Sequence, residues 1–318
     1  MQRVYNIIVD DSEVMNCGNL SWSDDIDTIT CEFSFESTSP IKTGSKIMIA
    51  NAQTGMEVLR GIITNRKILK NKKYQYSGFD YGFYLNKNEV IIQFNNVKID
   101  LAIKQLCQKV NVPVGNICSI NAYVTKIFKD VVVSDIINEL LELASKKTGS
   151  KYIFSCQNGK LEIIDTKEEC NADIELASGV SINIADSLSN IDYEESIQDM
   201  KNSIQFVDSN EKSKFVVASA KDDESISEFG LLNQVETIDK DDKTSKSVMA
   251  SNLLKELNKV KRTLTVDLLG VDDFKKGSIL SLDYPEYEVS GKYYAKTTNH
   301  SVKNRIHYCS AEMVKIDD

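Results

Sequence analysis

The chain has 318 residues, a mass of 35.7 kDa and a net charge of −9, and 42% of its residues are hydrophobic. This length exceeds one average domain and supplies enough apolar residues for substantial cores. The acidic balance argues against a general nucleic-acid-binding protein, while a mean hydropathy of −0.27 and the absence of a long apolar run argue against a membrane span.

Residues 1–85 are predicted to form short antiparallel strands. Polar and apolar residues alternate over 28–36, as they do in a strand with one buried face. The Gln-Thr-Gly run at 53–55 predicts a hairpin turn. Roughly five or six such strands indicate a sandwich or barrel, and we place Trp22 in the loop after the first strand, as a lid on the barrel end. The first residues lack the pattern of a signal peptide, so we expect synthesis in the cytoplasm.

The middle region switches to helical spacing. Apolar residues recur at steps of three and four over 99–110, and Pro113 stops this helix. A second helix is predicted to begin with Ser134 as its N-cap and to end at Gly149. The Asn-Gly pair at 158–159 predicts a hairpin.

The last region returns to strands over 176–210. A polar and acidic stretch follows, which is interpreted as an excursion between two strands of one barrel. Within it, residues 245–260 carry an apolar face and predict a helix. The final strands form a hairpin over 292–314. No exact repeat is visible.

These patterns predict a mainly β fold with an α+β insertion. We divide the chain into a first β-barrel at 1–85, an α+β middle domain at 86–175 and a second β-barrel at 176–318. The second barrel contains the excursion, near 211–260.

The sequence offers little for catalysis or metal binding. Seven cysteines are scattered with no CxxC pair, and His300 and His307 are the only histidines, so no metal site is expected. Neither a GxSxG elbow nor a GxGxxG or GxxxxGK[ST] phosphate loop occurs. We therefore expect no catalytic residue and no cofactor, and we interpret His300 as a structural or exposed strand histidine. The basic clusters at 67–73 and 255–262 are interpreted as solvated surface.

Several stretches together resemble one protein family. Asp80-Tyr81, the run at 84–88 and the Val-Pro-Val-Gly-Asn-Ile run at 112–117 are similar to the baseplate hub proteins of PBSX-type prophages, the XkdQ/YqbQ family. This family is related to late control protein D and to the N-terminal part of VgrG spikes. The resemblance is diffuse and covers nearly the whole chain. The matching positions are Asp80, Tyr84, Leu85, Gly115, Met200, Lys201, Asn202, Gly230, Gly277 and His300.

This resemblance implies two tail-tube-like antiparallel barrels flanking the mixed middle region. It implies a non-enzymatic hub in which three copies form a six-fold-like ring that joins the tail tube to the spike. The implied partners are the chain itself as a homotrimer, the tail tube or its LysM-type adaptor, the spike, the wedge and the tape-measure protein. The implied location is the bacterial cytoplasm during assembly and then the baseplate of a phage tail or a tail-like bacteriocin.

Two other classes of function stay open from the residues. One is a tail-associated peptidoglycan hydrolase, for which His300 would be needed. The other is a carbohydrate-binding β module, which a single tryptophan disfavours and 13 tyrosines keep possible.

Overall fold

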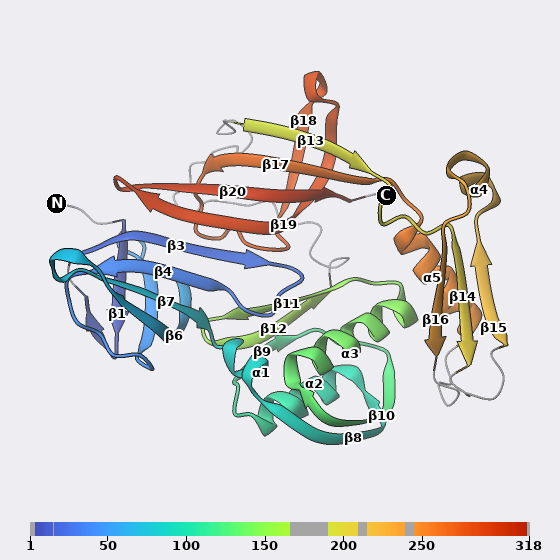
Figure 1. Cartoon of the computed structure of the whole chain (residues 1–318), viewed down its shortest axis with the longest axis horizontal. Helices are drawn as coiled ribbons and strands as arrows, with labels where there is room; N and C mark the ends of the chain where they lie inside the picture. Colours follow the sequence, from blue (N-terminus) through green and yellow to red (C-terminus); the bar gives the residue numbers. More distant parts are fainter. Residues whose placement is uncertain (1–3, 15, 166–189, 209–214, 239–244, 317–318) are drawn as a thin grey trace.

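A computed structural model describes residues 4–14, 16–165, 190–208, 215–238 and 245–316. Most of its strands belong to one large sheet (Figure 1). The strands of this sheet are β1 (Tyr5–Val9), β2 (Ser12–Glu13), β3 (Cys17–Asp25), β4 (Glu32–Ser37), β5 (Lys46–Asn51), β6 (Glu57–Ile68), β7 (Tyr74–Asp80), β13 (Asn190–Ser196), β17 (Lys261–Leu269), β18 (Ile279–Tyr284), β19 (Val289–Lys303) and β20 (Ile306–Lys315).

Eight of these strands form a continuous antiparallel layer in the order β13-β17-β20-β19-β3-β4-β7-β6. β5 pairs with the first half of β6 and β18 pairs with β19, so each half of the layer curls over. We call β1–β7 the first barrel and β13 with β17–β20 the second barrel. The two are joined where β3 pairs with β19, so segments from opposite ends of the chain lie side by side.

The two barrels match each other in register. Gly44 donates its N–H to the Ile63 carbonyl at 2.7 Å, and Gly277 donates its N–H to the Ala295 carbonyl at 2.8 Å. A register shift follows directly after Ile63 in β6 and after Ala295 in β19. The strands β3-β4-β5-β6-β7 therefore correspond to β13-β17-β18-β19-β20.

Each barrel packs its own apolar core against one face of the layer, because residues alternate between the two faces of a strand. The first core contains Leu20, Trp22, Phe33, Phe35, Ile47, Ile49, Leu59, Ile63 and Tyr76. The second core contains Leu264, Val266, Phe274, Leu280, Leu282, Tyr293, Ala295, Ala311 and Met313.

The middle region is built from two similar strand–helix units. Its elements are α1 (Phe83–Lys87), β8 (Glu89–Lys98), α2 (Ile99–Lys109), β9 (Val114–Ile117), β10 (Tyr123–Val132), α3 (Val133–Thr148), β11 (Tyr152–Gln157) and β12 (Lys160–Asp165). Asn96 and Asp130 take positive φ angles of 53° and 54° at the same point before α2 and α3. β8 and β10 pair antiparallel, and both helices pack into one core.

Several expectations for this region are confirmed. The helix over 99–110 is α2, the turn at 158–159 joins β11 to β12, and Gly149 ends α3 with φ of 70°. The expected N-cap is wrong. α3 begins one residue earlier, and Ser134 is buried within its first turn, because the chain runs from β10 directly into the helix.

A small α/β unit lies between β13 and β17 in the chain. It contains β14 (Ser203–Asp208), β15 (Val216–Lys221), α4 (Asp223–Phe229), β16 (Asn233–Ile238) and α5 (Lys246–Leu257). β14 lies between β15 and β16, and α5 packs on one face of this sheet. α5 matches the helix expected over 245–260. α4 is not among the expected helices, although Asp222 caps its N-terminus and Gly230 follows its last residue. The strands expected over 176–189 lie outside the described residues.

Candidate functional site: the polar face of the eight-stranded layer

Five neighbouring strands place polar side chains on one face of the layer. Ser23 of β3 lies opposite Glu32 of β4 and opposite Asn299 of β19. Asn299 lies opposite Ser310 of β20, which in turn lies opposite Asp267 of β17. Directly opposed residues point to the same side of a sheet, so this polar row crosses both barrels without a break.

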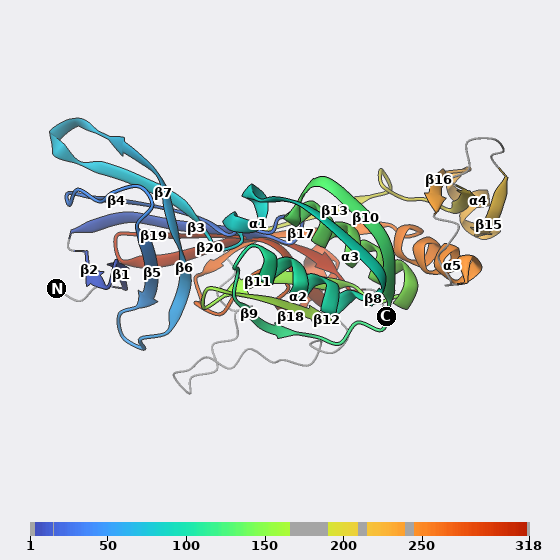
Figure 2. The ribbon, with the colours of Figure 1, turned by 90° about the horizontal axis from the view of Figure 1, so that it is seen from below.

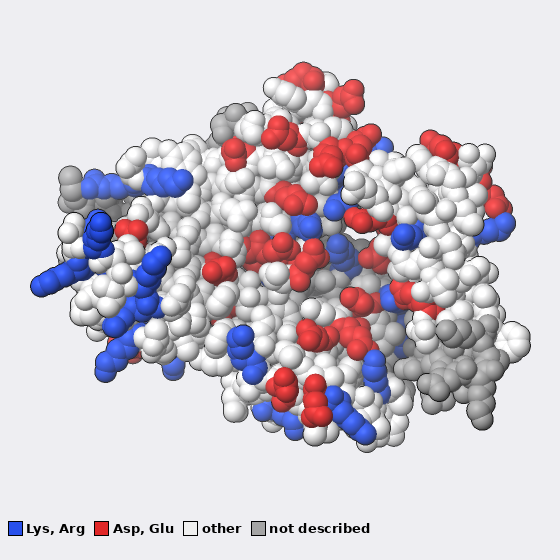
Figure 3. Space-filling model, viewed as in Figure 1, with Lys and Arg blue, Asp and Glu red and all other residues white. Residues whose placement is uncertain are grey.

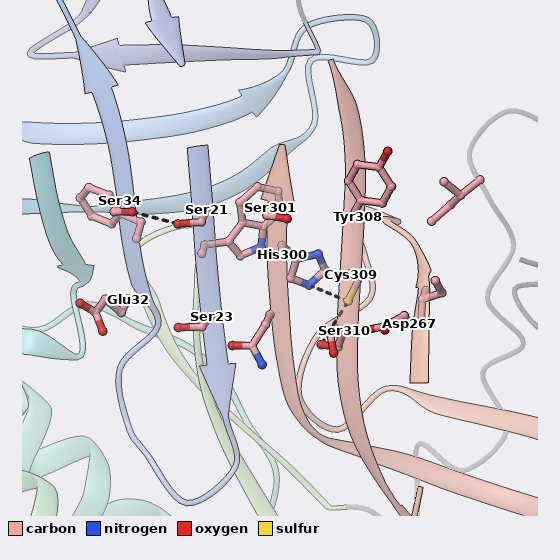
Figure 4. A pocket seen from close by; sticks show the side chains of 15 residues that line it. Ser21, Ser23, Glu32, Ser34, Asp267, His300, Ser301, Tyr308, Cys309 and Ser310 are labelled. Atoms are coloured by element: carbon pink, nitrogen blue, oxygen red, sulfur yellow. Dashed lines mark hydrogen bonds between the residues drawn. The ribbon is translucent and has the colours of Figure 1, made fainter. Parts of the chain in front are cut away.

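A second row beside it consists mainly of hydroxyl groups. Ser21 lies opposite Ser34 and Ser301, and its Oγ is 2.9 Å from Ser34 Oγ. The row continues to Ser77 of β7 on one side and to Tyr308 of β20 on the other. Much of the two rows lines an open hollow of about 720 Å³ (Figure 4). We call the surface formed by these two rows the polar face.

The polar face carries short side chains and little positive charge. Glu32 and Asp267 are the carboxylates that line the hollow, and its described lining contains neither lysine nor arginine. Basic side chains gather instead toward the end of the molecule where the β6–β7 hairpin lies (Figure 3). Short hydroxyl side chains offer few strong contacts, and carboxylates repel anions. This surface therefore offers no strong attraction to an anion.

On the side of the layer opposite the polar face, the junction between the barrels contains a series of linked, buried side chains. The Trp22 ring stacks on His300 at 4.8 Å, and His300 Nδ1 lies 2.9 Å from His307 Nε2. His307 Nδ1 lies 2.8 Å from the Tyr5 hydroxyl, which also donates to Asp272. Because Tyr5 and Trp22 come from the first barrel and the others from the second, these contacts join the two barrels.

The expectation that Trp22 lies in a loop is wrong. Trp22 lies in the middle of β3 and is 6% exposed. A register shift between Gly18 and Ser21 interrupts the alternation that would have revealed this strand. The interpretation of His300 as a structural histidine agrees with its burial in β19.

The histidines and the nearby thiol are poorly suited to nucleophilic catalysis. Cys309 Sγ lies 3.7 Å from His300 Nε2. Burial raises the pKa of Cys309 to about 12, whereas burial and the neighbouring His307 lower the pKa of His300 to about 3. A thiolate–imidazolium pair needs the opposite shifts. Both groups therefore stay neutral, and we assign them to packing.

A buried lysine forms a second contact between the barrels. Lys276 Nζ lies 2.9 Å from Asp24 Oδ1 and donates to the backbone carbonyls of Asp25 and Thr28 at 3.2 and 2.8 Å. The ammonium also lies 5.8 Å from the ring centre of Phe154 in the middle region. One cation thus contacts the first barrel and the middle region from the second barrel.

Asp80 lies near this lysine at the end of β7. Its carboxylate accepts the backbone N–H groups of Cys31 at 3.1 Å and Gly82 at 2.9 Å. Burial raises the pKa of Asp80 to about 8. Gly277 directly follows Lys276 and takes φ of 81° at the turn into β18. Asp80 and Gly277, like His300, are therefore family-resembling positions that lie at the junction of the barrels.

Asn202 and Gly230 meet in the small α/β unit. Asn202 is fully buried, and its Nδ2 donates to the Gly230 carbonyl at 2.7 Å while its Oδ1 accepts the Leu232 N–H at 2.8 Å. These bonds hold the turn after α4. Met200 is buried just before Asn202, and the Lys201 N–H binds the Leu257 carbonyl at 3.1 Å.

The remaining family-resembling positions lie in the middle region. Leu85 is fully buried on α1, and Tyr84 beside it packs against the same core. Gly115 lies in β9, where a Cβ atom would be 2.9 Å from Glu162 Oε1. The ten positions are thus spread over the barrel junction, the small unit and the middle core, and they do not form one site.

Sequence reasoning missed Lys276, Asp24 and Asp272, which all act at the barrel junction. The sequence does contain a signal for Lys276. Lys42-Thr43-Gly44-Ser45 in the first barrel and Lys275-Lys276-Gly277-Ser278 in the second occupy the same turn, and in both the serine N–H binds the first lysine's carbonyl. This short repeat would have aligned the two barrels.

Across the described ranges, no cluster of three or more histidine, cysteine, aspartate or glutamate side chains is arranged to hold a metal ion. In the same part of the chain, no helix is both long enough and apolar enough to cross a membrane.

Comparison with known proteins identifies the class. A family model described as YqbQ-like matches residues 20–314, and the chain belongs to this family. YqbQ of Bacillus subtilis strain 168 is 26% identical over 82% of this chain and 78% of its own length. The phage-like element PBSX protein XkdQ of the same strain is 25% identical over 82% of this chain and 79% of its own length.

The fold is also shared with a solved tail protein. A tail protein from Neisseria meningitidis MC58 has a TM-score of 0.72 at 14% identity, covering 99% of this chain and 97% of that one. The expected family and the mainly β tail-protein fold are therefore confirmed.

Proposed function

We propose that the chain is a non-enzymatic hub of a contractile-tail baseplate, in which three copies form a ring around a channel. The observation that carries this proposal is the eight-stranded antiparallel layer, which crosses two register-matched barrels. Among the described residues, β13 and the part of β6 beyond Ile63 have no strand on their outer sides. Open edges favour pairing with another strand. Since each chain supplies two equivalent barrels, three copies would supply six positions around one axis.

In this proposal the polar face is the wall of the channel. Its serine and asparagine side chains, with Glu32 and Asp267, would let a polymer slide through without strong binding. The apolar cores would lie outside this wall. The chain would bind no nucleic acid specifically.

The other regions would contact the rest of the baseplate. We propose that residues 1–85 and 176–318 form the two tube-like barrels and that 86–175 faces outward toward neighbours such as the wedge. The tail tube or a LysM-type adaptor would stack on one rim of the ring, and the spike would close the other. The tape-measure protein would end in the channel. The particle would be a phage tail or a tail-like bacteriocin, assembled in the bacterial cytoplasm.

The test is the native mass of the purified chain by light scattering, followed by negative-stain images. A ring of three copies has a mass of about 107 kDa, three times 35.7 kDa, and shows a central hole. A monomer or an open dimer that shows no ring at any concentration would overturn the proposal.

The hydrolase alternative receives no support from the geometry, because His300 and Cys309 are buried and neutral. A zymogram with peptidoglycan checks this directly. We expect no clearing by the wild-type chain. Clearing that disappears in His300→Ala, with the fold retained, would contradict a purely structural role.

A further inference from the structure

The junction inside the chain shows how two such barrels meet. Residues 297–301 of β19 pair antiparallel with residues 21–25 of β3. The counterpart of β19 is β6, and the counterpart of β3 is β13. Among the described residues, β13 has no strand on its outer side, and β6 beyond Ile63 pairs only with β7. Each chain therefore carries one unpaired edge of each type.

The internal correspondence also fixes which residues would meet. Trp22 lies opposite Phe33, and Tyr193 lies opposite Leu264, the counterpart of Phe33. Tyr193 therefore holds the position of Trp22. Trp22 pairs with His300. Along β19, His300 lies as many residues after the register shift as Ile68 does along β6, so His300 and Ile68 are counterparts. Transferring the junction to the free edges thus places Tyr193 opposite Ile68.

One step along the strands, the same transfer brings opposite charges together. Ser23 pairs with Asn299 inside the chain. Their counterparts on the free edges are Glu194 and Lys67, which are both exposed. Glu195 already binds Arg262 of β17 at 2.9 Å, so Glu194 is the carboxylate best placed to meet a second chain.

We propose that β13 of one copy pairs antiparallel with the distal half of β6 in the next copy, with Glu194 opposite Lys67 and Tyr193 opposite Ile68. This inference rests on the proposed ring and names the strands that close it. The partner of each edge is a second copy of this chain. The contact is head-to-tail, which is the kind that generates rings.

Three features of the edges support this partner. Ile68 is 65% exposed, and pairing would cover it as Trp22 covers His300. Residues 65–74 contain five lysines and arginines and no acid, whereas β13 contains three acids and no basic residue. The β6–β7 hairpin also projects beyond the first barrel, where a neighbour can reach it (Figure 2). An even number of strands lets the antiparallel alternation continue from copy to copy.

Cysteine cross-linking tests the register. We expect Lys67→Cys combined with Glu194→Cys to form disulfide-linked dimers and trimers under mild oxidation, seen on a non-reducing gel. Each single variant is a matched control for the seven native cysteines. Lys67→Cys with Asp192→Cys keeps the same face but shifts the pair by two residues, so we expect at least about fivefold less cross-linking from it.

Charge exchange tests the attraction. Glu194→Lys or Lys67→Glu alone should weaken association by about tenfold at low salt, because like charges then face each other. The double variant restores an opposite pair and should return to within about threefold of wild type. Each variant's circular dichroism shows whether its barrels are folded.

The outcomes separate this inference from the proposed function. If the wild-type chain forms the 107 kDa ring but the cysteine pair does not cross-link and both single reversals assemble normally, the strand pairing is wrong and the ring stands. If the wild-type chain forms no ring, both proposals fail. Specific cross-linking with rescue by the double reversal would establish the pairing.

Discussion

The two barrels fill one equivalent position of their cores in different ways. In the first barrel, Phe33 of β4 lies opposite Gly78 of β7, and a Cβ atom on Gly78 would be 2.6 Å from the Phe33 ring. In the second barrel, the corresponding pair is Leu264 and Met313. The first barrel places a large ring opposite a glycine, whereas the second places two flexible apolar side chains of similar size opposite each other. Backbone register is therefore retained while the side-chain volume at this pair is divided differently between the two strands, as expected when total core volume matters more than residue identity.

The barrels also differ in what their equivalent turns contact. The turn before β5 is exposed at Thr43, whereas the same turn before β18 places Lys276 against the first barrel and the middle region. At the same position of this turn, one barrel thus contacts other parts of the chain and the other barrel is exposed to solvent. Four experiments test this comparison.

The largest expected effect is at the buried lysine. Lys276→Met removes the partner of Asp24, which stays buried, and we expect a loss of roughly 3–5 kcal/mol in the free energy of unfolding. Thr43→Ala, at the equivalent turn, should change nothing measurable. Urea unfolding followed by tryptophan fluorescence reports both. A loss below about 1 kcal/mol at Lys276 would show that the ion pair does not hold the junction.

Substitutions at the equivalent core positions should have the second-largest effect. Gly78→Ala forces a Cβ atom against the Ile62 carbonyl and the Phe33 ring, and we expect about 3 kcal/mol of destabilisation by overpacking. Adding Phe33→Leu should recover part of this loss, since the second barrel has leucine there. Met313→Ala should instead destabilise by opening a cavity, with no recovery from a smaller residue at Leu264. Thermal unfolding of these variants distinguishes overpacking from cavity formation.

Acid should weaken the junction through its histidines. Burial lowers the pKa of His300 to about 3 and that of His307 to about 4. The unfolded chain therefore binds more protons between about pH 6.5 and these values, and stability falls as the pH falls through this window. We expect each of the two histidines to contribute a loss of about 2 kcal/mol between pH 6.5 and 4.5. The slope should be shallower in His300→Gln, and an unchanged slope would exclude this cause.

The smallest effect should come from the paired turn glycines. Gly44 and Gly277 take φ angles of 87° and 81°, so alanine at either should cost roughly 1 kcal/mol. A Cβ atom on Gly44 meets open space, whereas one on Gly277 would lie 2.8 Å from Ile153 Cδ1 in the middle region. Gly277→Ala should therefore be the more damaging of the two. Equal losses in denaturant unfolding would show that Ile153 moves freely aside.

The sequence was informative where structure depends on neighbouring residues. Apolar spacing located α2, and the Asn-Gly pair located the turn between β11 and β12. β3 and the start of α3 were harder to predict. The register shift near Gly18 interrupts the alternation of β3, and the strand before α3 runs directly into the helix, so the usual capping signal is absent.

The junction could not be predicted, because its contacts join distant parts of the chain. His300 meets Trp22 and His307 meets Tyr5 across nearly the whole sequence. No local pattern encodes such a pairing. The hydroxyl row on the polar face has the same origin, since four serines and a tyrosine on five strands become a surface only when the strands are aligned. The family resemblance implied the arrangement of the strand-rich and helical regions. The role of each residue could be assigned only once the pairing register of the strands was known.

The position of the small α/β unit has a practical consequence. Ser196, the last residue of β13, lies opposite Lys261, the first residue of β17. The chain therefore leaves and re-enters the layer at adjacent points, and to the layer the whole of residues 197–260 is equivalent to a long turn. Such a site tolerates changes in length, because closing a longer loop adds little entropic cost. A fluorescent protein or an affinity tag could replace the unit there and report on assembly while the barrels keep their strands.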